Sequence, residues 1–144
     1  MSDPTGSESF NEGLRVRRSV LGDKYVDAAL AGATEFSKPM QQLVTEYCWG
    51  TIWTRDGLPL KTRSLLNLAI LAVLNRPQEF ASHVRGAVKN GASPQEIQEV
   101  LLQTAVYAGV PCGIEAFRIA STVLRDLESQ GGDADDQVTQ AAES

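Results

Sequence analysis

Residues 60–74, LKTRSLLNLAILAVL, constrain the fold more than any other part of the chain. They are apolar almost all the way round the helix that their spacing predicts. A helix without a polar face lies at the centre of its domain, with other helices packed around it. Arg76 and Pro77 end this segment, because proline cannot continue a helix. The sequence therefore predicts a core built around one central helix.

The remaining apolar spacings also predict helices, and no run of alternating β-branched residues predicts a strand. The expected helices cover 11–20, 23–31, 37–53, 78–90, 94–108 and 112–128. Ser93 and Glu96 form a capping box at the start of one of them, and Asn90-Gly91 ends another. The 144-residue chain is long enough for one core. The prediction is an all-α, single-domain helical bundle of about six to seven helices over residues 10–129. The polar segments 1–9 and 130–144 are predicted to be disordered.

Composition excludes several classes of protein. Thirteen basic residues against eighteen acidic ones give a net charge of −5, which argues against a nucleic-acid-binding face. No stretch approaches the length of a membrane span, and the N-terminus lacks a hydrophobic signal core, so a cytoplasmic protein without a membrane partner is expected. The two cysteines, Cys48 and Cys112, form no CxxC motif and are too few for a cysteine zinc site. No metal site and no nucleotide fingerprint are predicted.

The segment EYCWGTIW, residues 46–53, carries the first candidate site. Glu46, Trp49, Gly50 and Trp53 share one face of a regular helix, and a carboxylate between two indoles would be partly desolvated, which favours its protonated form. Gly50 leaves room that another group is expected to occupy. The alternative is that the two tryptophans form an oligomer interface with Glu46 at its rim. A second, core-facing surface of the same helix is predicted to contain Met40, Leu43, Val44, Tyr47 and Cys48.

His83, the one histidine of the chain, is the second candidate. It lies on or beside the face that Phe80, Val84 and Ala87 bury, four residues after Glu79. A partly buried histidine with a carboxylate partner can act as a general acid or base near neutral pH. The alternative is a core or interface histidine without a chemical role.

Arg63 is the third candidate, because it lies with Asn67 on the otherwise apolar segment 60–74. A buried guanidinium needs an anion. That anion is Glu46, Glu79 or a bound carboxylate. The N-terminal arginines Arg15, Arg17 and Arg18 are predicted to form a solvated face.

Four segments together resemble one known family. They are RVRRSVLGDKYVDAAL (15–30), TEYCWGTIWTRDGL (45–58), TRSLLNLAILAVLNRPQEFASHVRGAVKNG (62–91) and EIQEVLLQTAVYAGVPCGIEAF (96–117). Their WGxIW, RSLL, HVRGA and YxGVP elements are similar to those of the carboxymuconolactone decarboxylase family. The resemblance covers about residues 10–128.

The resemblance implies an alkylhydroperoxidase D-like helical fold, a homo-oligomer (trimer or hexamer) and decarboxylation of 4-carboxymuconolactone to the enol-lactone in the protocatechuate branch of aromatic degradation. Peroxidase-type members of the superfamily carry CxxC before the histidine. Arg76 and Glu79 take those two positions here, which excludes a dithiol peroxidase.

The implied reaction needs no cofactor, because the lactone ring itself accepts the electron pair of the departing carboxylate. His83 and Glu46 are the predicted catalytic residues. The predicted substrate-binding residues are Arg63, Trp49, Trp53, Glu79 and, in the YxGVP element, Tyr107. Two alternatives stay open: a decarboxylase or isomerase for another small carboxylated ring, and a non-enzymatic helical oligomerisation module.

Overall fold

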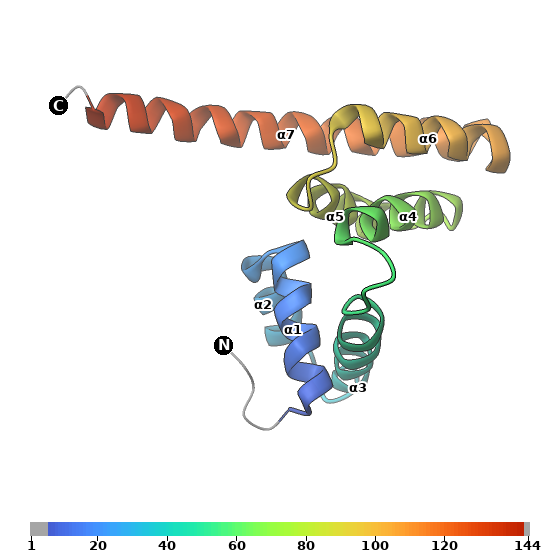
Figure 1. The fold of residues 1–144 in the computed structure, drawn as a ribbon, viewed down its shortest axis with the longest axis vertical. Coiled ribbons are helices and arrows are strands. Elements are labelled where there is room, and N and C mark those ends of the chain that lie inside the picture. The colour runs from blue at the N-terminus through green and yellow to red at the C-terminus, as the bar shows by residue number, and fades with distance from the viewer. Residues whose placement is uncertain (1–5, 143–144) are drawn as a thin grey trace. The chain divides into compact units, whose positions relative to one another are not determined.

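The computed structural model describes the backbone of residues 6–142 and the side chains of residues 6–131. The helices are α1 (Glu8–Leu21), α2 (Asp23–Ala31), α3 (Lys38–Leu43), the π-helix η1 (Val44–Ile52), α4 (Leu60–Val73), α5 (Pro77–Lys89), α6 (Pro94–Ala108) and α7 (Val110–Ala142) (Figure 1). Residues 6–142 contain no strand, so the all-α prediction is confirmed. None of these helices is both long and apolar enough to cross a membrane.

The chain divides into two compact units, residues 1–64 and residues 65–144. Each has its own cluster of buried apolar side chains. One core was predicted from the length of the chain. The boundary falls inside α4, a continuous helix whose first turn belongs to the first unit.

The first unit begins with α1. The side chain of Ser7 caps the N-terminus of this helix, because it accepts a hydrogen bond from the Phe10 amide at 3.1 Å. Gly22 ends the helix with a φ of 91°, a conformation that favours glycine, so α1 and α2 are separate helices, as the expected ranges 11–20 and 23–31 indicated. The predicted helix over 37–53 is also present, as α3 continuing into η1.

Helices α1 and η1 of the first unit cross at two glycines. A Cβ atom on Gly13 would overlap the Thr45 carbonyl oxygen, and one on Gly50 would overlap the Ser9 carbonyl oxygen. The two backbones can approach this closely only because neither glycine has a side chain. The group predicted to occupy the space at Gly50 is therefore the backbone of α1.

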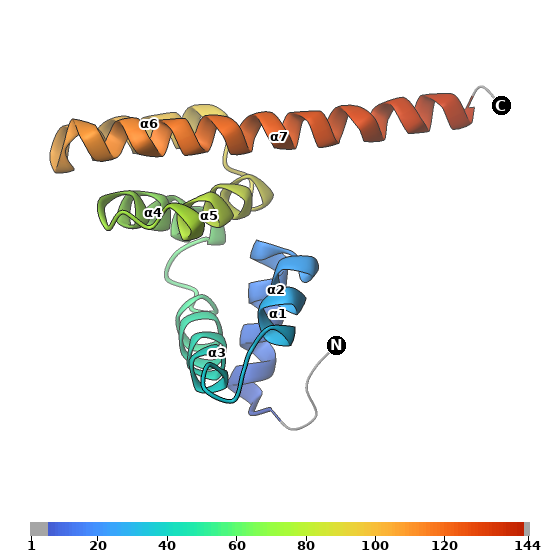
Figure 2. The same ribbon diagram turned by 180° about the vertical axis from the view of Figure 1, so that it is seen from behind.

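The second unit encloses the larger core. Its buried residues come from α4, α5, the loop after α5, α6 and α7: Leu68, Ala72, Phe80, Val84, Ala87, Ala92, Ile97, Leu101, Ala116, Ala120 and Val123. Helices α6 and α7 lie side by side, and α5 packs against α7 (Figure 2). The Ser93 side chain accepts a hydrogen bond from the Glu96 amide at 3.1 Å, which confirms the predicted start of α6.

Helix α4 is not buried on all sides, contrary to prediction. Leu68 and Ala72 are buried, but Leu66, Ile70 and Val73 are about half exposed. The physical reason is that the second unit has too few helices to surround an all-apolar one. An apolar face is left uncovered within the described part of the single chain.

The ends of the chain are described only in part. Helix α1 begins at Glu8, two residues before the predicted domain start at residue 10. Residues 1–5 of the predicted disordered segment 1–9 lie outside the described residues. Helix α7 overlaps the predicted disordered tail 130–144, whose side chains from residue 132 onward are not described.

Candidate functional site

The predicted site residues fall in both units. Glu46, Trp49, Trp53 and Arg63 belong to the first, whereas Glu79, His83 and Tyr107 belong to the second.

Trp49 and Trp53 form the centre of the first unit. Their rings stack with centroids 4.6 Å apart and an interplanar angle of 28°. Both are buried, and they cluster with Val16 and Val20 of α1. The tryptophan pair is therefore core within the single chain, and the alternative of an exposed tryptophan interface is wrong. A substrate-binding role for these residues stays a prediction.

The π-helical geometry of η1 changes which side chains share a face. In a π-helix the backbone bonds join residues five apart, as the Trp53 amide does with the Cys48 carbonyl at 3.0 Å. Thr45 is fully buried with the tryptophans, whereas Glu46 is half-buried. The Glu46 carboxylate accepts a hydrogen bond from the Ser7 hydroxyl. Glu46 thus lies beside the N-terminus of α1, where negative charge is favourable.

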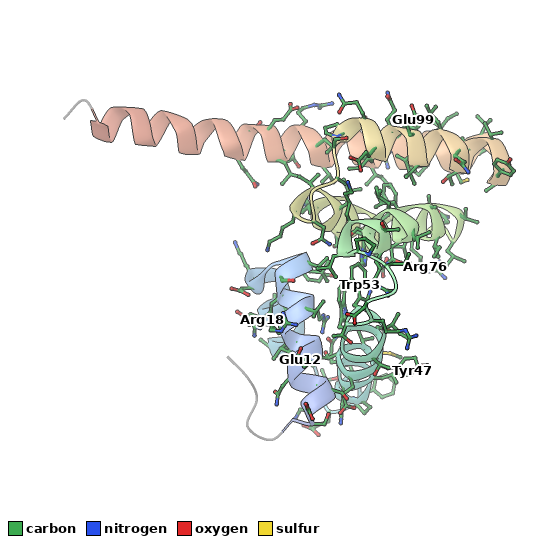
Figure 3. All side chains as sticks on the ribbon, in the orientation of Figure 1. Glu12, Arg18, Tyr47, Trp53, Arg76 and Glu99 are labelled. Carbon is green, nitrogen blue, oxygen red and sulfur yellow. The ribbon has the colours of Figure 1, made fainter. Side chains whose placement is uncertain are left out.

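The second surface predicted for this segment is exposed rather than buried. Met40, Leu43 and Tyr47 are each more than half exposed, and Cys48 is also exposed. Tyr47 points outward from η1, away from α1 (Figure 3). The prediction that Cys48 is a small core residue is therefore wrong. The cause is that the helix buries a single face, the one that the tryptophans take.

Arg63 lies in the first turn of α4 and is half-buried. Its Nη2 donates to the Arg55 carbonyl at 3.2 Å. Its Nε is enclosed and has no hydrogen-bond partner among the described residues. Binding of a carboxylate by Arg63 stays a prediction.

The three N-terminal arginines differ, although a common solvated face was predicted. Arg15 is exposed and pairs with Glu12 at 3.0 Å, whereas Arg18 pairs with Asp27 at 2.6 Å, toward α2 (Figure 3). Arg17 is only 5% exposed. Its burial follows from the spacing of Gly13, Val16, Arg17 and Val20, which places all four on the side of α1 that faces η1. That periodicity was the signal that sequence reasoning missed.

His83 of α5 has the partly buried position that was predicted, beside the buried residues Phe80, Val84 and Ala87. Burial lowers the pKa of His83 below its usual value, and the charge of Glu79 on the same helix opposes that shift. The imidazole is therefore neutral at pH 7. A neutral imidazole donates one hydrogen bond and accepts one, which suits proton transfer.

The other predicted groups of the second unit are more open. Tyr107, near the end of α6, is 86% exposed. A hollow lined by Arg76, Phe80 and Cys112 has a volume of about 20 Å³, room for about one water molecule and too small for a substrate. Among the described residues, no three His, Cys, Asp or Glu side chains gather in a group that could hold a metal ion.

Comparison with known proteins agrees with this all-helical arrangement. The model of the carboxymuconolactone decarboxylase family matches residues 38–122, more than half of the chain. This chain belongs to that family. The match contains η1, α4, α5 and α6, and hence every predicted site residue.

Two relatives are similar over most of their length. A nitrosuccinic acid decarboxylase from Metarhizium robertsii is 43% identical over 134 residues, which cover 90% of this chain and 94% of that protein. A 4-carboxymuconolactone decarboxylase from Acinetobacter baylyi is 37% identical over 120 residues, covering 83% of this chain and 90% of that protein. The names of both relatives specify decarboxylation, but of different acids.

Proposed function

We propose that this protein is a cofactor-free decarboxylase of a small dicarboxylic acid whose departing carboxylate is on a carbon that either bears an electron-accepting group or is conjugated with one through a double bond. The observation that carries the proposal is the similarity, over more than four fifths of the chain, to two decarboxylases of different acids. The two acids share this chemistry.

The first candidate substrate is 4-carboxymuconolactone. The bond from the ring carbon to the departing carboxylate breaks, and its electron pair moves through the ring double bond into the lactone carbonyl. The resulting dienolate takes one proton at the α carbon and becomes the enol-lactone, with carbon dioxide as the other product. The ring supplies the electron sink.

The second candidate is nitrosuccinate, favoured by the 43% identity over 134 residues. Here the carboxylate leaves the carbon that bears the nitro group, and the electron pair moves into that group as a nitronate. One proton at the same carbon completes the reaction. Both substrates keep a second carboxylate, so both need a cation that holds it and a group that delivers one proton.

The predicted residues supply these functions. His83, neutral at pH 7, donates a hydrogen bond to the developing oxyanion. The proton is transferred from its imidazolium form, which takes a proton from solvent and returns to the neutral imidazole after the transfer. Arg63, whose Nε has no hydrogen-bond partner in the described part of the chain, holds the carboxylate that remains. Trp49 and Trp53 are proposed to provide an apolar setting within the first unit, and the roles of Glu46, Glu79 and Tyr107 stay predictions.

The test is a turnover panel with 4-carboxymuconolactone, nitrosuccinate and simple succinate, which has no electron sink. Release of carbon dioxide and the product identified by NMR should show one of the first two acids consumed and succinate untouched. Activity should survive a chelator without any added coenzyme. Loss of activity with the chelator, or turnover of neither acid, would contradict the proposal.

Replacing His83 should separate chemistry from folding. His83→Ala is expected to lower kcat by about 10²–10⁴, the usual contribution of a general acid or base. Lys89→Gln, an exposed change on the same helix, is the matched control and should leave kcat unchanged. Circular dichroism should show the same helix content in both variants. Full activity of His83→Ala would remove His83 from the mechanism.

We also propose that the protein is a homo-oligomer, a trimer or hexamer. Support comes from the apolar residues that the single chain leaves exposed on the second unit: Leu66, Ile70, Val73, Leu74, Leu102, Val106, Val110 and Ile114. Apolar surface of this kind marks an association site. Light scattering should give a mass of three or six chains, and a monomer would contradict the proposal.

A further inference from the structure

Arg17 is a buried cation that pairs with no anion among residues 6–131. The side chain is 5% exposed, and its Nη1 donates to the Gln41 side-chain oxygen at 3.0 Å and to the Thr45 hydroxyl at 3.2 Å. Both partners are neutral. The enclosed Nε has no hydrogen-bond partner, and no carboxylate pairs with Arg17, among the described residues.

The neighbouring arginines show that the lack of a carboxylate partner is not a general property of the arginines of α1. Arg15 pairs with Glu12, and Arg18 with Asp23 and Asp27. Arg15 and Arg18 are more exposed than Arg17 and therefore need an anionic partner less, yet each of them has one. Burial lowers the pKa of Arg17, which reflects the cost of holding the charge away from water. An anion beside the guanidinium would compensate the buried charge, which its two neutral partners do not.

Gln41 shows where that anion would lie. Its amide oxygen occupies the position of a carboxylate oxygen against Nη1, and the side chain is only half-buried, so it can move aside. Thr45 lies deeper, fully buried on the π-helix η1, and holds the guanidinium in place. Helices of this type often occur at functional sites.

We propose that Arg17 is a binding site for a carboxylate of a small acid, which displaces the Gln41 side chain. The inference rests on the proposed function for its ligand class: Arg17 would hold one carboxylate of the dicarboxylic substrate. Arg17 is then a second substrate-binding cation of the first unit, in addition to Arg63.

The test uses succinate as the probe and measures the melting temperature and the dissociation constant. Succinate should raise the Tm of the wild-type protein, and its neutral diamide should not. Arg17→Gln should weaken succinate binding by about 30-fold or more, the usual effect of removing one member of a buried charge pair. Arg15→Gln, the exposed control, should bind succinate as the wild type does.

The sharpest variant is Gln41→Glu, which supplies the missing carboxylate within the chain. We expect its Tm to rise by about 3 °C without succinate. We also expect it to bind succinate about 30-fold more weakly, as Arg17→Gln does, because the position against Arg17 is already filled. Gln42→Glu adds the same charge at an exposed neighbouring position and should change neither quantity.

The outcomes distinguish this inference from the proposed function. If neither Gln41→Glu nor Arg17→Gln weakens succinate binding, or if the wild-type protein does not bind succinate, Arg17 is not a carboxylate site. A Tm that depends on protein concentration but not on succinate would assign the anion to a second copy of the chain and would also overturn the inference. Succinate binding at Arg17 without turnover of either acid would instead contradict the proposed function alone.

Discussion

The two units of the chain are built in different ways. The core cluster of the second unit contains eleven buried apolar residues from four helices and a loop, whereas that of the first contains four, two of them tryptophans. The first unit buries Arg17 and Thr45 beside its cluster and brings two backbones together at glycines. The second unit depends on the amount of apolar surface, and the first on close fit and polar partners. Substitutions that test volume and substitutions that test fit should therefore affect the units differently.

The largest expected effect is in the second unit. Phe80 is 1% exposed at the centre of its core, so Phe80→Ala should cost about 4 kcal/mol in the free energy of unfolding. Chemical denaturation followed by circular dichroism measures this loss. Phe36→Ala, at a fully exposed phenylalanine of the first unit, should change stability by less than about 0.5 kcal/mol. Equal losses in the two variants would contradict the assignment of the core.

The first unit should be sensitive to a much smaller change. Gly13→Ala adds one methyl group where the Thr45 carbonyl already lies, so the backbones of α1 and η1 must separate, at a cost of about 2–3 kcal/mol. Gly57→Ala adds the same group in open space and serves as the control. Chemical denaturation measures the free energy of unfolding of both variants. A wild-type stability for Gly13→Ala would mean that the close crossing is not needed.

Each unit also has a serine cap, which permits a direct comparison. Ser93→Ala should cost about 1 kcal/mol, because the Glu96 amide loses its partner. Ser7→Ala removes the cap of α1 and also the hydrogen bond to Glu46, so it should cost at least as much. Thermal melts of the two variants give the comparison. A smaller loss for Ser7→Ala would mean that the contact with Glu46 adds nothing.

The smallest effect is a pH dependence that arises in the second unit. Because burial lowers the pKa of His83 in the folded state, the unfolded chain binds the proton more tightly. This contribution is constant above about pH 6.5, the pKa of free histidine, and stability falls as the pH drops below that value. His83→Gln should give a flatter stability profile between pH 7 and 5. Parallel profiles for the two proteins would contradict this account.

Local features were predictable from the sequence where one residue type determines the structure. The end of α1 at Gly22, the start of α6 at Ser93 and the partly buried position of His83 followed from capping rules and helical spacing. The space at Gly50 was also predictable, but its occupant was not, because the approach of α1 depends on tertiary packing.

Three features were not predicted, each for a physical reason. No residue pattern signals a π-helix, so the α-helical spacing placed Glu46 rather than Thr45 with the tryptophans. Arg17 was placed in solvent because arginine is rarely buried. The division into two units lies inside α4, whose sequence is continuous, so no composition change marks the boundary.

The π-helix has a consequence for the length of the chain around it. A π-helix holds its turn with more residues than an α-helix, so the loss of one residue between 44 and 52 would shorten the segment toward ordinary α-helix without breaking it. The indole of Trp53 would then take a different direction relative to Thr45, because a residue of an α-helix advances by about 100° and a residue of the wider π-helix by less. The π-helix thus determines the relative directions of the side chains at the two ends of the segment, and deletion of a single codon would change them.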